Sequence, residues 1–201
     1  MEKHTVSASL TDNTKYMNRA LPVKKSFDII ERTLIIGGQN SAFYFIDGFT
    51  KDEIMLKLID SFLNISADDM PEDATSFSTS CIPYVEVDIL GDFDSIFKNL
   101  LSGVTCLFID GYEAAIAIDC RTYPSRSIEE PDKDKSLRGS RDGFVETIVF
   151  NTALMRRRIR DPHLIMEMYE AGTSTRTDVA LCYMSDRVDR ELLTTIQNKL
   201  E

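Results

Sequence analysis

Two strand–turn–strand patterns constrain the fold of this chain more than any other feature. Residues 27–36 are apolar and rich in β-branched side chains, Gly37-Gly38-Gln39-Asn40 offers a tight turn, and 41–46 is a second apolar run. Farther along, 104–109 and 114–119 flank Asp110-Gly111, and Asp-Gly favours the positive φ values of hairpin turns. The pattern therefore predicts two hairpins in the first part of the chain.

Amphipathic helices are expected between these hairpins. Thr50 and Glu53 have the spacing of a capping box, and the apolar residues that follow fall on one helical stripe. A second helix is expected to begin after Asp92 and to end at Gly103. An alternating strand over 84–89 precedes it. Strands that alternate with amphipathic helices predict an α/β fold.

Three stretches have no clear apolar periodicity. Residues 1–25 are predicted to be a polar N-terminal arm, with a short docking helix capped by Thr11 or Asp12 as the equal alternative. Residues 66–80 are polar and acidic, so a solvated loop is favoured there over a metal-binding loop. Residues 120–143 contain two prolines and two glycines and predict a boundary or hinge.

These observations divide the chain into an arm over 1–25, a first α/β subdomain over 26–125, and a linker with a second, helix-rich α/β subdomain over 126–201. We expect two small subdomains of mixed sheet with flanking helices.

The second subdomain is expected to contain a helix over 144–160, a short helix after Asp161-Pro162 that reaches Gly172, a strand over 177–184 and a final helix. A single strand cannot form a sheet. Either this strand joins the first sheet, or chain beyond residue 201 supplies its partners, and we favour the second alternative. The second subdomain is therefore predicted to be incomplete.

Charge and composition limit the function. The chain has a net charge of −10 and a pI near 4.8, which argues against nucleic acid as a partner, because such affinity comes mostly from Lys and Arg on phosphates. The four cysteines form no CxxC pair and indicate buried thiols in a reducing compartment. Without a signal peptide or a long apolar run, the chain is expected to be soluble and intracellular.

Residues 131–160 are basic within this acidic chain, with eight Lys or Arg against four Asp or Glu. Such a cluster needs an anionic partner. Internal or inter-subunit salt bridges are favoured, because the guanidinium fork suits carboxylates and the rest of the chain supplies them. An acidic partner surface and a bound phosphate remain as alternatives. The candidate subdomain or subunit contacts are Arg138, Gly139, Arg141, Gly143, Arg156, Arg157, Arg158 and Arg160.

Catalytic signatures are absent from the sequence. It contains no GxGxxG, Walker, HExxH or CxxC motif, and the spacing of Gly139-Ser140-Arg141 does not match a nucleophile elbow. The two histidines, His4 and His163, offer little for a nucleophilic centre. We therefore expect no enzymatic activity, no catalytic residues, no cofactor and no metal.

The run EPDKDKSLRGSRDGFVE at 130–146, with the Asn151–Arg160 helix, resembles the GerA-type spore germination protein family. Residues 26–28, 37–38, 43–49 and 81–86 are closer to its stage V sporulation AF branch than to its nutrient-receptor A subunits. The resemblance covers about residues 26–200.

The resemblance implies a cytoplasmic N-terminal domain of a spore inner-membrane protein, followed by a stretch that completes the second subdomain and by a membrane region. It implies partners among copies of the chain and other germination membrane proteins, in an ion-conducting complex. The competing hypothesis is a module that binds a small anion or small molecule in the cleft between the subdomains.

Overall fold

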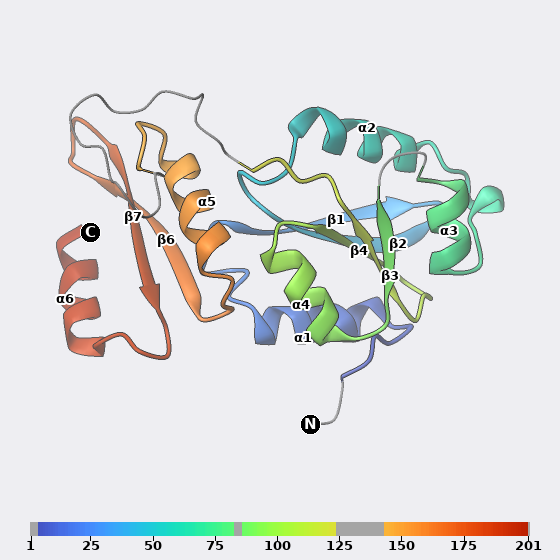
Figure 1. The fold of residues 1–201 in the computed structure, drawn as a ribbon, viewed down its shortest axis with the longest axis horizontal. Coiled ribbons are helices and arrows are strands. Elements are labelled where there is room, and N and C mark those ends of the chain that lie inside the picture. Colours follow the sequence, from blue (N-terminus) through green and yellow to red (C-terminus); the bar gives the residue numbers. More distant parts are fainter. Residues whose placement is uncertain (1–3, 83–85, 124–142, 201) are drawn as a thin grey trace, which may run out of the picture.

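The computed structural model describes residues 4–82, 86–123 and 143–200. They form a five-stranded sheet of order β1-β2-β4-β5-β3 and a two-stranded sheet of β6 and β7 (Figure 1). The strands are β1 (Ile29–Ile36), β2 (Gln39–Ile46), β3 (Val87–Leu90), β4 (Thr105–Ile109), β5 (Ala115–Ile118), β6 (Leu164–Ala171) and β7 (Thr177–Met184). The helices are α1 (Leu10–Ala20), α2 (Asp52–Leu63), α3 (Ala74–Ser80), α4 (Phe93–Leu101), α5 (Ile148–Arg158) and α6 (Arg190–Leu200), with a 3-10 turn at Ala67–Asp69.

The α/β class with flanking helices is confirmed, and both predicted hairpins are present. Gly37 and Gly38 have φ values of 53° and 79° and connect β1 to β2, whose Ile36 pairs with Gln39. Two successive positive φ values are those of the type I′ turn, which matches the twist of the strands. Strand pairing is antiparallel throughout the described residues, whereas mixed sheets were expected.

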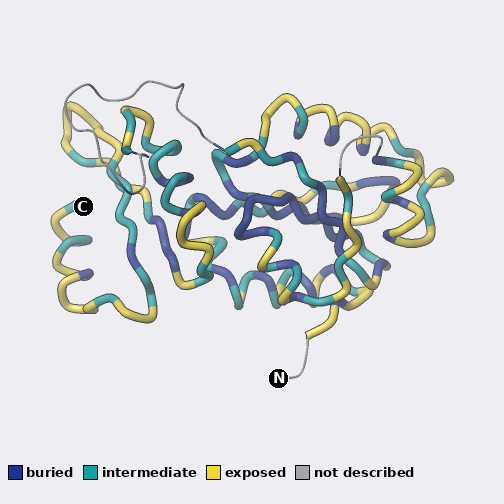
Figure 2. Tube along the Cα trace, in the orientation of Figure 1, coloured by how far each residue is buried: buried dark blue, intermediate teal, exposed yellow. Residues whose placement is uncertain are grey.

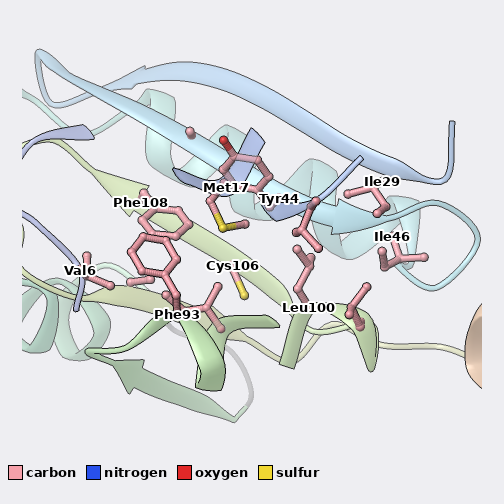
Figure 3. Close-up of a cluster of buried hydrophobic side chains, with 14 of the residues drawn as sticks. Val6, Met17, Ile29, Tyr44, Ile46, Phe93, Leu100, Cys106 and Phe108 are labelled. Carbon is pink, nitrogen blue, oxygen red and sulfur yellow. The ribbon is translucent and has the colours of Figure 1, made fainter. Parts of the chain in front are cut away.

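Alternating residues of the first sheet pack into two cores. Figure 2 shows that buried residues are concentrated along the strands of this sheet. Tyr44 faces α1 and α4 in one cluster, shown in Figure 3, while its neighbour Phe43 faces α2 and α3 in the other. Both side chains are fully buried. Burial of one large apolar side chain contributes about 1.5–3 kcal/mol, so the two helical layers hold the sheet from both sides.

The N-terminal region forms a helix that packs into the core. Leu10 and Met17 of α1 are buried against the sheet, so the docking-helix alternative describes this segment. Its N-cap is Ser9, which accepts from the Asp12 backbone N–H, in place of the expected Thr11 or Asp12. The Leu10 N–H also donates to the Asp110 carboxylate, 2.8 Å away, which fixes the start of the helix against the β4–β5 turn.

Two local predictions were wrong in the first unit, by which we mean the described residues 4–82 and 86–123. Helix α2 has Lys51 at its N-cap without a side-chain cap, because Thr50 forms a β-bridge with Arg121 and so stands outside the helix. The acidic stretch at 66–80 is partly helical, since the Asp73 side chain caps α3. The strand predicted over 84–89 is present as β3 from Val87, and residues 84 and 85 lie outside the described part of the chain. Strand β3 lies at the sheet edge, which leaves Ile89 37% exposed.

The second unit, by which we mean the described residues 143–200, contains a hairpin where a short helix and a lone strand were predicted. Residues Leu164–Ala171 form β6 and pair with β7 along its full length. The hairpin supplies the partner that β7 lacked in the sequence analysis. Helix α6 covers one face of this sheet, with Leu193 packed against Ile165 and Tyr183. The expected completion of this unit by further chain stays a prediction, as do the domain boundaries.

Candidate functional site

Helix α5 lies between the two sheets (Figure 1). It begins at Ile148, later than predicted, and Phe144 precedes it with 68% exposure. The Asn151 side chain reaches back to the Val145 backbone. It accepts a hydrogen bond from the Val145 N–H and donates one to the Val145 C=O, both at a distance of 2.7 Å. Because Asn151 binds the Val145 backbone in this way, residues 143–147 run beside the first turn of α5 and do not extend the helix. The predicted break at Asp161-Pro162 is present.

The α5 helix contacts the first unit at a glycine. Gly48 has a φ of 77°, and a β-carbon placed on it would lie 3.1 Å from the Cβ of Ala153 and 3.3 Å from Cγ1 of Val149. The missing side chain therefore lets the helix approach the Asp47-Gly48 turn closely. Ala153 is buried in the same cluster as α1 and α4, so α5 contributes to the core of the first unit.

Arg156 is the centre of this junction. Its side chain is fully buried, as is that of Asp28. Its Nε lies 2.6 Å from Asp28 Oδ2, and its Nη2 lies 3.2 Å from Asp28 Oδ1. Its Nη1 also donates to the backbone C=O of Asp161 at 3.0 Å, and its Nη2 donates to that of Leu164 at 2.9 Å. A buried ion pair needs this degree of hydrogen bonding to offset the cost of desolvation.

The Asp28 carboxylate is held by a second set of contacts. The Ser26 hydroxyl donates to Asp28 Oδ1 and accepts from the Met166 N–H at 2.9 Å. The Phe27 N–H donates to the Met166 C=O, also at 2.9 Å. Residues 26–28 therefore bind along β6 before they enter β1. This segment, α5 and β6 form one interface, which we call the inter-sheet joint.

Arg157 occupies a different environment. Its guanidinium carbon lies 4.5 Å from the centre of the Tyr123 ring, and its side chain is exposed. Tyr123 packs edge-on against Phe49 and donates to the Ser102 C=O at 2.8 Å. Arg121, ion-paired with Asp119, approaches the same ring. A cation over an exposed aromatic face contributes only about 0.5–1 kcal/mol, so this contact is minor beside the buried pair.

The other predicted contact residues lie at the surface or outside the described part of the chain. Arg158 and Arg160 are exposed, and Arg160 donates to the Arg157 C=O at 3.3 Å. Gly143 is partly buried. Arg138, Gly139 and Arg141 fall within residues 124–142, outside the described residues.

Sequence reasoning missed Asp28 and Ser26. The pair Asp28–Arg156 is separated by 128 positions, and no periodicity links such distant residues. The available signal was the stretch Ser26-Phe27-Asp28, which directly precedes an apolar strand and is one of the stretches that carry the family resemblance.

The carboxylate of Asp47 lies near the buried pair, and the charge of Asp28 affects its pKa. Burial raises the pKa of Asp47, a hydrogen bond from the Gly48 backbone lowers it, and the nearby charges of Asp52 and Asp28 raise it further. The Asp47 N–H also donates to the Asp28 C=O at 2.8 Å. Asp47 is therefore a partly buried acidic group beside the joint, and the charges that shift its pKa, those of Asp52 and Asp28, are negative.

The described residues offer little for metal chemistry or membrane insertion. Residues 4–82, 86–123 and 143–200 bring no three His, Cys, Asp or Glu side chains into a metal-binding group. Over the same ranges, every helix is too short or too polar to cross a bilayer. His163 is exposed, with its Nδ1 2.9 Å from Asp161 Oδ1. The arrangement is that of a packed, charged junction between two units.

Comparison with known proteins agrees with the resemblance in the sequence. Residues 15–201 match the family described as "Bacillus/Clostridium GerA spore germination protein". The chain is 32% identical over 200 residues to "Stage V sporulation protein AF" of Bacillus subtilis (strain 168), a match that covers 99% of this chain and 41% of that protein. It is 30% identical over 200 residues to "Spore germination protein KA" of the same strain, covering 98% and 36%. The chain thus spans well under half the length of either relative.

The fold has a counterpart among solved structures. The crystal structure of the N-terminal domain of the A subunit of the Bacillus megaterium spore germinant receptor GerK3 superposes with a TM-score of 0.75 at 21% identity, covering 100% of this chain and 74% of that chain. The α/β arrangement described above is therefore that of a spore germination protein's N-terminal domain. On the match over residues 15–201, the chain belongs to the GerA family of spore germination proteins.

Proposed function

We propose that this chain is the soluble N-terminal domain of a spore germination membrane protein, where it acts in assembly and signal coupling of an ion-conducting germination complex. The observation that carries the proposal is the buried Asp28–Arg156 pair, which joins the two sheets at one point. A buried pair with four hydrogen bonds from its guanidinium fixes a unique geometry better than apolar packing alone. Such a joint suits a domain that passes a conformational change from one part of a protein to another without catalysing a reaction. We therefore propose no enzymatic activity.

Membership of the family supports a proposal about the location and the partners of the protein. We propose that the full-length protein resides in the spore inner membrane, with this domain on the cytoplasmic, spore-core side and a membrane region C-terminal to residue 201. Its partners would be copies of itself, other germination membrane proteins, or both, with no nucleic acid. Exposed arginines at the end of α5 (Arg157, Arg158 and Arg160), together with Arg138, Gly139, Arg141 and Gly143, are proposed contacts to acidic surfaces of those partners.

Spores that carry the full-length protein provide the test. Asp28→Asn with Arg156→Gln replaces the ion pair by two neutral amides, while Arg32→Gln changes an exposed arginine of β1 that lies outside the joint and the proposed partner contacts. Germinant-triggered ion release and the level of the protein in spores are measured together. We expect slower release from the double variant at a normal protein level and unchanged release from Arg32→Gln. Normal release from the double variant would contradict a coupling role for the joint.

The alternative is a ligand-binding module with a small anion or small molecule between the two units. The exposed guanidinium of Arg157 beside Tyr123 is the observation that favours it. Thermal unfolding in the presence of phosphate, nucleotides and amino acids separates the two functions. The proposal predicts an unchanged midpoint, whereas a specific rise at modest concentration would favour the ligand-binding module.

A further inference from the structure

The Glu167 carboxylate receives four hydrogen-bonding or charged partners from four parts of the chain. The Tyr183 hydroxyl donates to Oε1 at 2.9 Å, and the Lys25 ammonium lies 3.2 Å from the same oxygen. The Tyr169 hydroxyl donates to Oε2 at 2.8 Å, and the Gln197 amide donates to it at 2.7 Å. Each carboxylate oxygen thus has two partners, which fills the capacity of an ionised carboxylate.

These partners belong to different structural elements. Tyr169 lies on β6 with Glu167, Tyr183 on β7 and Gln197 on α6. Lys25 belongs to the connection between α1 and β1, one residue before the Ser26–Asp28 segment that binds along β6. Lys25 also lies over the Tyr183 ring, 5.5 Å from its centre. One carboxylate therefore connects the first unit, the second sheet and the last helix.

The environment of the network keeps Glu167 ionised. Its side chain is only 11% exposed. Burial alone would raise the pKa of Glu167, but hydrogen bonds from Tyr169, Gln197, Tyr183 and Lys25 outweigh it and lower that pKa. The Tyr183 hydroxyl and the Glu167 carboxylate raise the pKa of Lys25, against the lowering effect of its own burial. Both partners therefore keep their charges over the neutral pH range.

Helix α6 has few buried side chains of its own. Leu193 is buried, and Ile196 and Leu200 are half-buried. The bond from Gln197 to Glu167 is the polar anchor of the helix, one turn beyond Leu193. Rotation of the carboxylate would move both of its oxygens together, so a change at the Lys25 end alters the acceptor offered to Gln197.

We infer that Glu167 is a positioning residue that couples α6 to the first unit: displacement of Lys25 weakens the attachment of α6, and displacement of α6 weakens the contact with Lys25. Coupling between two groups through a shared partner is reciprocal. This inference extends the proposed coupling function by naming the route through which the first unit acts on the last helix, and its test does not depend on germination.

Hydrogen exchange of the α6 amides measures the coupling in the chain itself. Lys25→Met keeps much of the aliphatic length of the side chain but removes its charge, and the exposed neighbour Lys24, changed to Met, is the matched control. We expect Lys25→Met to accelerate exchange in α6 about two- to fivefold, with amides of β2 and β4 unchanged, and Lys24→Met to have no effect. Wild-type exchange in α6 of the Lys25→Met protein would overturn the inference.

A second variant distinguishes coupling from general loosening. In a Gln197→Leu background the helix has already lost its bond to Glu167, so adding Lys25→Met should leave α6 exchange at the level of Gln197→Leu alone. Independent, multiplying effects of the two substitutions would show that Lys25 and Gln197 act separately, which would also overturn the inference. Either outcome leaves the Asp28–Arg156 proposal untouched, because that pair contains none of these residues.

Discussion

A β-carbon on Gly48 would lie 3.1 Å from the Cβ of Ala153, although the two residues are far apart in the sequence. Asp47-Gly48 and Asp110-Gly111 are similar strand-end dipeptides, and both glycines have positive φ, 77° and 92°. They differ in their surroundings, because nothing lies within 4 Å of a β-carbon at Gly111. The two turns share backbone chemistry, but only Gly48 forms part of the inter-sheet joint.

This difference gives a matched pair of substitutions. Both Gly48→Ala and Gly111→Ala place an L side chain at positive φ, which costs about 1 kcal/mol or more. Gly48→Ala must also displace Ala153 and Val149, so we expect it to lower the free energy of unfolding by about 1–3 kcal/mol more than Gly111→Ala does. Urea unfolding followed by circular dichroism measures both. Equal losses would mean that α5 does not pack closely on the turn.

Arg157 is predicted to matter little for stability. The sequence favoured salt bridges for the clustered arginines, but Arg157 is exposed and its guanidinium lies over the Tyr123 ring. We now expect Arg157→Ala to lower the free energy of unfolding by less than about 1 kcal/mol. Arg160→Ala, on the same helix end, should be neutral. A loss as large as that of Arg156→Ala would contradict the assignment of Arg156 as the central arginine.

Asp47 gives a pH-dependent prediction. Burial raises the pKa of Asp47 above its ordinary value of 3.8, so the folded state favours the protonated carboxyl group. The ionised carboxylate therefore destabilises the folded state fully above the folded-state pKa and not at all well below 3.8. Asp47→Asn should therefore raise the unfolding midpoint by about 1–2 °C at neutral pH. The gain should disappear as the pH falls through 3.8. A gain that persists in acid would show that charge is not its cause.

Much of the first unit could be predicted from local patterns. The glycine turns, the Asp92 cap and the Gly103 terminator each depend on neighbouring residues alone, and the structure has all of them. Helix α3 was missed because its sequence ATSFSTS has one large apolar residue, Phe77, which is too few for a periodic stripe. The family was also recognisable, since its motif extends over a long continuous run.

Strand β6 was mistaken for a helix for a physical reason. Leu164, Ile165 and Met166 are all buried, because both faces of the strand are covered where it meets the joint. The alternation typical of a strand is therefore lost in its first half, and the following Met and Glu are good helix formers. Among the clustered arginines, the sequence likewise gave no reason to rank Arg156 above its neighbours, because burial is set by Asp28 and Leu164 across the joint.

A double-mutant cycle on Asp28 and Arg156 tests the central claim most directly. The variants are Asp28→Asn, Arg156→Met and the two combined, with the free energy of unfolding measured for each by urea titration. Each single substitution should cost about 3–5 kcal/mol, because it leaves a buried charge without its partner. The combined variant should cost less than the sum by about 2 kcal/mol or more. Simple additivity would contradict a joint held together by this ion pair.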